Sequence, residues 1–268
     1  MEVTLESIAT LRGLPLSPPS GTPGTTSGKM PDATGNQPRL AIWPVVPLTR
    51  RMTDKHAPLN SLFIPAADKT SRRLWVMLHG LGDSVEGYRW MPEAFQLPWM
   101  NYLLVNAPDE YYGGFSWFEF AEDGNPEVMR PGIERSRQLL FQLLDAQRAA
   151  GFPTDQTILG GFSQGCLMSL DVAARYPHKL AGVVGISGYV CEPERVVKEL
   201  SPVAKEQKFL VTHGTFDPLL AIDVTREQIK LLQRAGLDIR WHEFRKEHTI
   251  AGQAEIDLIR EFVTGCFA

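Results

Sequence analysis

The chain has 268 residues, of which 43% are hydrophobic and 22% charged, a balance typical of a globular protein with one sizeable core. Its formal net charge of −4 offers no basic surface for a polyanion, so no nucleic-acid partner is expected. The sequence has no apolar run long enough to span a bilayer and no secretory signal at its N-terminus, so we predict no integral membrane segment.

Residues 1–51 differ in composition from the rest of the chain. About a quarter of them are Pro or Gly without a fixed period, which is typical of disordered sequence. We therefore predict a Pro/Gly-rich flexible N-terminal arm over residues 1–51 and a catalytic domain over residues 52–268. Met52 is an alternative start of the natural protein, so the arm is either a real extension or the product of an overlong gene model.

From about residue 59, short apolar runs alternate with longer amphipathic stretches. The short runs are rich in Val, Ile, Leu and Phe and predict buried strands at Leu74–Leu78, Tyr102–Val105, Thr157–Phe162, Leu180–Ile186, Phe209–Thr212 and Ile239–Phe244. Apolar residues at helical spacing predict helices at Ile133–Ala149, Gln164–Tyr176, Ile222–Ala235 and Ile250–Phe262. This alternation predicts an α/β fold, with a mostly parallel central sheet and helices on both faces.

A glycine-rich loop, Leu-His-Gly-Leu-Gly-Asp-Ser at residues 78–84, follows the first predicted strand. Its glycines allow a backbone N–H to approach a bound carbonyl group closely. His79 lies at the end of the strand, where we interpret it as a structural residue rather than a base.

Aromatic residues are dense between Pro108 and Phe120, on the loop that follows the second predicted strand. Trp117 and Phe118 either line an apolar substrate pocket or plug the top of the core, and the pattern favours neither interpretation. We name both as candidate substrate-binding residues.

The pentapeptide Gly-Phe-Ser-Gln-Gly at residues 161–165 lies where a predicted strand meets a predicted helix. That setting is required of a nucleophile elbow, in which a serine is held out on a very tight turn. Gly161 and Gly165 remove the Cβ atoms that would collide there, and the N-terminus of the following helix favours developing negative charge. Ser163 is therefore the predicted nucleophile, the alternative being an ordinary glycine-rich turn with a serine cap.

The residues that would complete such a site also occur in the order that an α/β-hydrolase requires. In this fold the oxyanion is bound by the N–H after the nucleophile and by one from an early loop, which predicts Gln164 and Leu81. The acid and then the base follow the serine in the chain. Asp217 lies on a loop after a strand, and His248 lies four residues after the last predicted strand, so we predict them as acid and base.

Other downstream residues compete for these two roles. His213 and His242 lie within or at the end of predicted strands, where histidines usually pack or donate hydrogen bonds. Asp223 belongs to a predicted helix and Glu243 to a predicted strand, which makes both weaker candidates for the acid.

Four motifs together resemble the phospholipase/carboxylesterase family, which includes acyl-protein thioesterases, lysophospholipases and small bacterial carboxylesterases. They are residues 78–84, Ser-Trp-Phe-Glu at 116–119, residues 161–165 and His-Gly-Thr-Phe-Asp-Pro at 213–218. The resemblance covers the chain from about residue 59 to its end and implies a cofactor-free α/β-hydrolase fold with little or no lid. Ser163, Asp217 and His248 match the family's triad, and Leu81 and Gln164 match its oxyanion donors.

The chain departs from the family pattern in three places. The family often has a glycine shortly before the catalytic histidine, whereas Arg-Lys-Glu occupies residues 245–247 here. The small residue that commonly follows the elbow is Cys166. The arm before Met52 has no counterpart in the family pattern.

The predicted function is that of a serine carboxylesterase, acting on a small-molecule ester or thioester through an acyl-enzyme. An acylated protein or a lysophospholipid are the alternative substrates at the same site. A dienelactone hydrolase is disfavoured because it typically carries cysteine where Ser163 stands. A non-catalytic binding protein with a hydrolase fold is the alternative from a different class. Acyl chain length and oligomeric state are left open.

The histidines, glycine-rich loops and cysteines of the sequence bear on cofactors and cellular location. The histidines have no paired metal-binding spacing, and no Gly-x-Gly-x-x-Gly or Walker loop occurs, so neither a metal nor another cofactor is expected. The three cysteines, Cys166, Cys191 and Cys266, are widely spaced and odd in number. We interpret them as reduced thiols of a cytoplasmic protein.

Overall fold

The computed structural model describes residues 50–51, 58–121 and 123–268. The predicted flexible arm over residues 1–51 lies outside the described residues except for Arg50 and Arg51. The alternative start at Met52 lies outside them as well.

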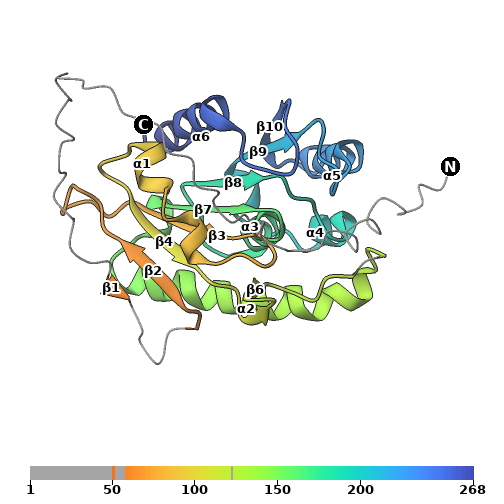
Figure 1. Cartoon of the computed structure of the whole chain (residues 1–268), viewed down its shortest axis with the longest axis horizontal. Coiled ribbons are helices and arrows are strands. Elements are labelled where there is room, and N and C mark those ends of the chain that lie inside the picture. Colours follow the sequence, from red (N-terminus) through yellow and green to blue (C-terminus); the bar gives the residue numbers. More distant parts are fainter. Residues whose placement is uncertain (1–49, 52–57, 122) are drawn as a thin grey trace, which may run out of the picture.

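The described residues form one eight-stranded sheet and a separate two-stranded hairpin (Figure 1). In spatial order the sheet contains β1 (Arg50–Arg51), β2 (Ser61–Ile64), β4 (Asn101–Val105), β3 (Leu74–Leu78), β7 (Thr157–Phe162), β8 (Gly182–Ile186), β9 (Lys208–Gly214) and β10 (Asp238–Phe244). From β4 to β10 all neighbouring strands are parallel, and at one edge β2 pairs antiparallel with both β4 and β1. The hairpin pairs β5 (Asp109–Tyr111) with β6 (Gly114–Ser116).

Helices cover both faces of the sheet (Figure 1). One face carries α2 (Pro126–Ala149), α3 (Gln164–Arg175), α4 (Pro193–Lys198) and α5 (Ile222–Arg234), and the other carries α1 (Met91–Phe95) and α6 (Gly252–Gly265). Short 3-10 helices occur at Val85–Tyr88, Thr154–Gln156 and Ala204–Glu206. The arrangement is the predicted mostly parallel sheet between two helical layers.

The apolar runs of the central strands explain why the sheet has two cores. All five residues of β3 are buried, and alternate side chains of a strand point to opposite faces. Leu74, Val76 and Leu78 accordingly pack into the core beneath α2 and α3, while Trp75 and Met77 pack into the core beneath α1 and α6.

The six predicted strands and four predicted helices are all present, with the predicted bounds for β3 and β7 and shifted ends for the others. Helix α2 begins at Pro126 rather than at Ile133, because Asn125 caps it by accepting a hydrogen bond from the Glu127 N–H at 3.0 Å. It then continues through Pro131, a residue that usually marks a helix end. Helices α1 and α4, strands β1 and β2, and the β5–β6 hairpin were not predicted from the sequence.

The parallel register brings the predicted site residues to one edge of the sheet. Leu78 of β3 pairs with Gly161 of β7, so the loop after β3 lies beside the turn after β7. Strand β9 lies between β8 and β10, and its last residue, Gly214, pairs with Phe244. The segments that follow β3, β7, β9 and β10 therefore all leave the sheet at its C-terminal edge.

Candidate active site

The turn that carries Ser163 is held in a strained conformation. Ser163 has φ 54° and ψ −117°, a backbone region that L-residues rarely adopt, and it directly precedes the first residue of α3. A Cβ on Gly161 would lie 2.1 Å from the carbonyl oxygen of Gly165, and one on Gly165 would lie 2.2 Å from that of Leu78. Only glycine fits at both positions, as the sequence pattern predicted.

Three side chains from separate loops meet at this turn. His248 Nε2 lies 2.9 Å from Ser163 Oγ, and His248 Nδ1 lies 2.7 Å from Asp217 Oδ2. The Asp217 side chain is fully buried, and the His248 side chain is 13% exposed. The structure therefore joins the predicted nucleophile, base and acid in one chain of hydrogen bonds.

Asp217 is held as an acceptor by its own loop. Its Oδ1 accepts hydrogen bonds from the N–H groups of Leu219 and Leu220, each at 2.9 Å. Burial disfavours the charged carboxylate, but the hydrogen bonds from His248 and from the backbone outweigh it, so the pKa of Asp217 lies below its ordinary value. An ionised Asp217 accepts the Nδ1–H of His248 and thereby leaves Nε2 free to accept the hydroxyl proton of Ser163.

His213 is buried beside this acid and does not reach Ser163. Its Nε2 donates to the carbonyl oxygen of Leu220 at 2.9 Å and lies 3.7 Å from Asp217 Oδ2. Burial lowers the pKa of His213, so the ring is neutral, and its Nδ1 has no partner among the described residues. His213 thus supports the loop that carries Asp217.

The other competing residues lie on α5 and β10. The Glu243 carboxylate accepts from Arg226 Nε at 2.7 Å and from Trp241 Nε1 at 2.8 Å. Asp223 pairs with the same Arg226, and the exposed ring of His242 lies beside Phe244. None of the three competitors contacts Ser163, Asp217 or His248 through a hydrogen bond.

One predicted oxyanion donor, Gln164, belongs to the elbow, and the loop that carries the other, Leu81, lies beside it. A Cβ placed on Gly80 would lie 3.3 Å from the Cβ of Ser163, so the loop that carries Leu81 packs against the serine. Gln164 is the first residue of α3, where backbone N–H groups have no helical partner. Among the described residues, neither the Leu81 nor the Gln164 N–H donates a backbone hydrogen bond to another residue.

Comparison with known proteins places this geometry in a family. The Phospholipase/Carboxylesterase family model matches residues 59–267. Acyl-protein thioesterase 1 of Schizosaccharomyces pombe is 35% identical over 191 residues, which cover 66% of this chain and 82% of the relative. The chain belongs to the phospholipase/carboxylesterase family.

Solved structures agree with this assignment. Esterase PE8 superimposes with a TM-score of 0.71 at 26% identity, over 78% of this chain and 99% of that chain. Acyl-protein thioesterase 2 of Zea mays gives a TM-score of 0.64 at 22% identity, over 78% and 99% of the two chains. The predicted family, the α/β-hydrolase fold and the class of serine hydrolase acting on esters or thioesters are confirmed.

Trp117 and Phe118 were predicted to bind substrate, and their burial in this structure corrects that prediction. Both side chains are fully buried in the core, and Trp117 Nε1 donates to the carbonyl oxygen of His79 at 2.9 Å. They plug the top of the core, which is the other interpretation that the sequence allowed.

The buried side chain of Gln164 has a structural function that sequence reasoning missed. Its Oε1 accepts from the Trp117 N–H at 3.1 Å, and its Nε2 donates to the Phe118 carbonyl oxygen at 3.1 Å. The side chain therefore fastens the aromatic segment to the elbow. The co-occurrence of Ser-Trp-Phe-Glu and Gly-Phe-Ser-Gln-Gly was the sequence signal that could have suggested this contact.

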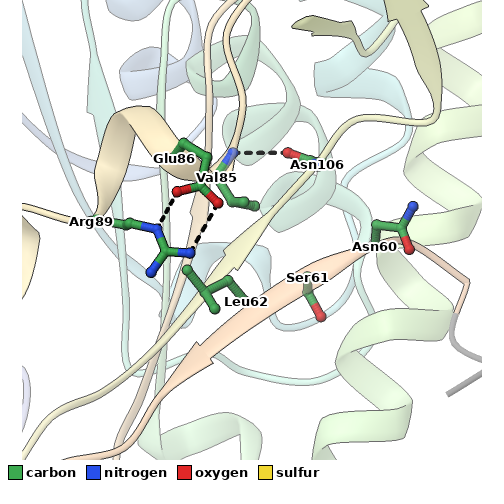
Figure 2. A pocket seen from close by; sticks show the side chains of 7 residues that line it. All are labelled: Asn60, Ser61, Leu62, Val85, Glu86, Arg89 and Asn106. Atoms are coloured by element: carbon green, nitrogen blue, oxygen red, sulfur yellow. Dashed lines mark hydrogen bonds and ion pairs between the residues drawn. The ribbon is translucent and has the colours of Figure 1, made fainter. Parts of the chain in front are cut away.

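A cavity of about 200 Å³ lies beside β2, the residue after β4 and the short helix at Val85–Tyr88 (Figure 2). It is lined by Asn60, Ser61, Leu62, Val85, Glu86, Arg89 and Asn106. The Asn106 side chain accepts from the Val85 N–H at 2.8 Å, and Glu86 forms an ion pair with Arg89 (Figure 2). None of the seven lining residues belongs to the predicted site.

Neither a candidate metal site nor a membrane-spanning helix occurs among the described residues. No group of three or more His, Cys, Asp or Glu side chains that could hold a metal ion occurs among them. Within the same residues, no helix has both the length and the apolar character needed to cross a bilayer.

Proposed function

We propose that this protein hydrolyses carboxylic esters and thioesters with Ser163 as nucleophile, His248 as general base and Asp217 as the acid that orients the base. The observation that carries the proposal is the unbroken chain of hydrogen bonds from Ser163 Oγ through His248 to Asp217. A serine hydroxyl is a weak nucleophile at neutral pH and needs such a partner.

The first half of the reaction acylates the enzyme. Ser163 Oγ attacks the substrate carbonyl carbon as its proton passes to His248 Nε2, and the oxyanion is stabilised by the N–H groups of Leu81 and Gln164. Collapse of the tetrahedral intermediate breaks the C–O or C–S bond, and His248 returns the proton to the leaving alcohol or thiol. Asp217 stabilises the imidazolium that forms between these two transfers.

The second half releases the acid. Water gives a proton to His248 Nε2 as its oxygen attacks the acyl carbon, and the same two N–H groups bind the second oxyanion. The bond to Ser163 Oγ then breaks, and the proton held by His248 returns to the serine.

We propose an apolar acyl group as the part of the substrate that this site recognises. Phe216 and Leu219, on either side of Asp217, are 57% and 37% exposed, so the loop beside the reacting atoms presents apolar surface. Relatives named acyl-protein thioesterase 1 support a protein thioester as the substrate, and the family's phospholipase members make a lysophospholipid the second candidate.

Two further parts of the proposal concern the limits and the location of the enzyme. We propose that the catalytic domain comprises residues 52–268, which the family match over residues 59–267 supports. A cytoplasmic location is supported by the three free thiols of Cys166, Cys191 and Cys266, since secreted proteins usually pair their cysteines.

Labelling with a fluorophosphonate probe tests the catalytic assignment. The wild-type protein is expected to be labelled on Ser163, and both Ser163→Ala and His248→Ala should abolish labelling. Ser163→Ala should also lower the turnover of p-nitrophenyl esters by about 10⁴- to 10⁶-fold. An unlabelled wild-type protein would favour the non-catalytic binding protein instead.

A substrate profile tests the class of substrate. The wild-type enzyme is assayed on p-nitrophenyl esters of increasing chain length, on a palmitoylated peptide and on a lysophospholipid, with Ser163→Ala as the blank. Preference for the peptide thioester supports the protein substrate, and preference for the lysophospholipid supports the second candidate.

A further inference from the structure

A buried ion pair involves Lys246 in the segment 245–247, where the chain departs from the family pattern just before His248. The side chains of Lys246 and Glu255 are 2% and 0% exposed, and Lys246 Nζ lies 2.6 Å from Glu255 Oε1. Lys246 precedes His248 by two residues, and Glu255 belongs to the first turn of α6.

The Glu255 carboxylate bonds to both ends of the segment that carries His248. Its Oε1 accepts from Lys246 Nζ, and its Oε2 accepts from the backbone N–H of Ala251 at 2.5 Å. These two bonds close residues 246–251 into a ring through one side chain. A third bond, from Thr212 Oγ1 to Glu255 Oε1 at 2.5 Å, anchors the ring to β9.

The backbone of Lys246 connects this ring to the loop of the acid. Its carbonyl oxygen accepts a hydrogen bond from the Phe216 N–H at 3.1 Å, directly before Asp217. A Cβ on Gly214 would lie 2.4 Å from the same oxygen, so the two loops are in tight contact. Lys246 is therefore in contact with the loop of Asp217 as well as part of the loop of His248.

Neither folding stability nor helix capping requires a buried ion pair at this place. Removing two charges from water is costly, and apolar residues of similar volume often stabilise a protein as well or better. A carboxylate that only caps α6 needs the Ala251 N–H and no buried lysine. Lys246 adds a connection from Glu255 to the other end of the segment that carries His248. This connection suggests that the position of His248 has to be fixed.

We propose that Lys246 and Glu255 are positioning residues that hold the His248 loop closed and so set the distance between His248 and Ser163. The proposal rests on the proposed function of that site. Because an error of about 1 Å in the geometry of reacting groups can lower the rate by about 100-fold, the loss of the pair should reduce turnover without weakening substrate binding.

Two double variants remove the pair in steps. Lys246→Met/Glu255→Gln removes both charges but keeps a side-chain oxygen for the Ala251 N–H. Lys246→Met/Glu255→Met removes the connections at both ends of the loop. We expect kcat for p-nitrophenyl butyrate to fall by about 10-fold in the first and about 100-fold in the second, with KM within about twofold of wild type.

A second buried ion pair provides the matched control. Arg137 NH1 lies 3.1 Å from Asp171 Oδ2 between α2 and α3, with side chains 10% and 8% exposed. Arg137→Met/Asp171→Leu removes this pair, together with the bond from Arg175 to Asp171, and does not change the His248 loop. Its kcat should stay within about threefold of wild type, whether or not its melting temperature changes.

Each outcome is decisive. Folded Lys246 and Glu255 variants with wild-type kcat, or the same loss of kcat in the control, would overturn the proposal. If neither double variant folds, the pair serves stability and the positioning role is rejected. Failure of the proposed function looks different, because the unmodified protein would then be neither active nor labelled on Ser163.

Discussion

Replacement of Asp217 by asparagine tests the chain of hydrogen bonds with the least change in shape. The asparagine oxygen would keep accepting from the Leu219 and Leu220 N–H groups, which now bond to Asp217 Oδ1 at 2.9 Å. The asparagine NH2 group would then occupy the position of Oδ2, 2.7 Å from His248 Nδ1. Flipping the amide would remove both backbone bonds, so this orientation is favoured.

The consequence is the wrong tautomer of His248. Facing a donor, Nδ1 must become an acceptor, and the ring proton moves to Nε2, which lies 2.9 Å from Ser163 Oγ. The ring can then no longer accept the hydroxyl proton. We expect kcat/KM to fall by about 10⁴-fold, which corresponds to about 5 kcal/mol of transition-state stabilisation.

The assay is hydrolysis of p-nitrophenyl butyrate at pH 7 by wild type, Asp217→Asn and Asp223→Asn. Asp223 is a matched control because its carboxylate is 85% exposed and pairs with Arg226 on the surface of α5. Its variant should keep activity within about twofold. A folded Asp217→Asn variant that retained more than about a tenth of wild-type activity would refute the proposed role of Asp217.

Three further predictions concern stability and the corrected residues. Gly165→Ala should lower the free energy of unfolding by at least about 1–3 kcal/mol in a urea titration, because the added Cβ would meet the carbonyl oxygen of Leu78; an unchanged value would contradict the elbow geometry. Phe118→Ala should cost about 3–5 kcal/mol without changing KM for p-nitrophenyl butyrate, whereas a raised KM at unchanged stability would restore the pocket interpretation. Because the pKa of Asp217 is lowered in the folded state, its contribution to stability is present at neutral pH. The difference in free energy of unfolding between wild type and Asp217→Asn should therefore stay constant above about pH 5. It should diminish as the pH falls through about 3.9 towards the lowered pKa of Asp217. A difference that does not depend on pH would contradict the lowered pKa.

Features with a local sequence signal were predictable. The bounds of β3 and β7 match the apolar runs that predicted them, because strands buried on both faces leave a continuous apolar pattern. Ser163 was predictable because the steric demands of the elbow are met by its own neighbours, Gly161 and Gly165. The start of α2 was missed because Asn125 caps it well before the amphipathic pattern becomes visible.

Features that depend on tertiary contacts were not predictable in the same way. From the sequence, Trp117 is equally compatible with a place in a substrate pocket and with a place in the core. Its place in the core depends on contacts with α2 and with the loop after β3, which are distant in the sequence. Lys246 follows a strand and looks like an ordinary surface lysine. The burial of Lys246 depends on its ion pair with Glu255, nine residues further along the chain. The spacing of residues in the sequence does not indicate such a pair.

Each member of the hydrogen-bonded chain is held in place by contacts that do not involve the other two. Ser163 is fixed by the turn and its glycines, Asp217 by two backbone N–H groups, and His248 by a loop whose ends share the Glu255 carboxylate. Groups fixed in advance do not need to reorganise when charge develops on the substrate. Removing one side chain should therefore leave the other two where they are, which is why the substitutions at residues 163, 217 and 248 are expected to abolish the rate while the fold persists.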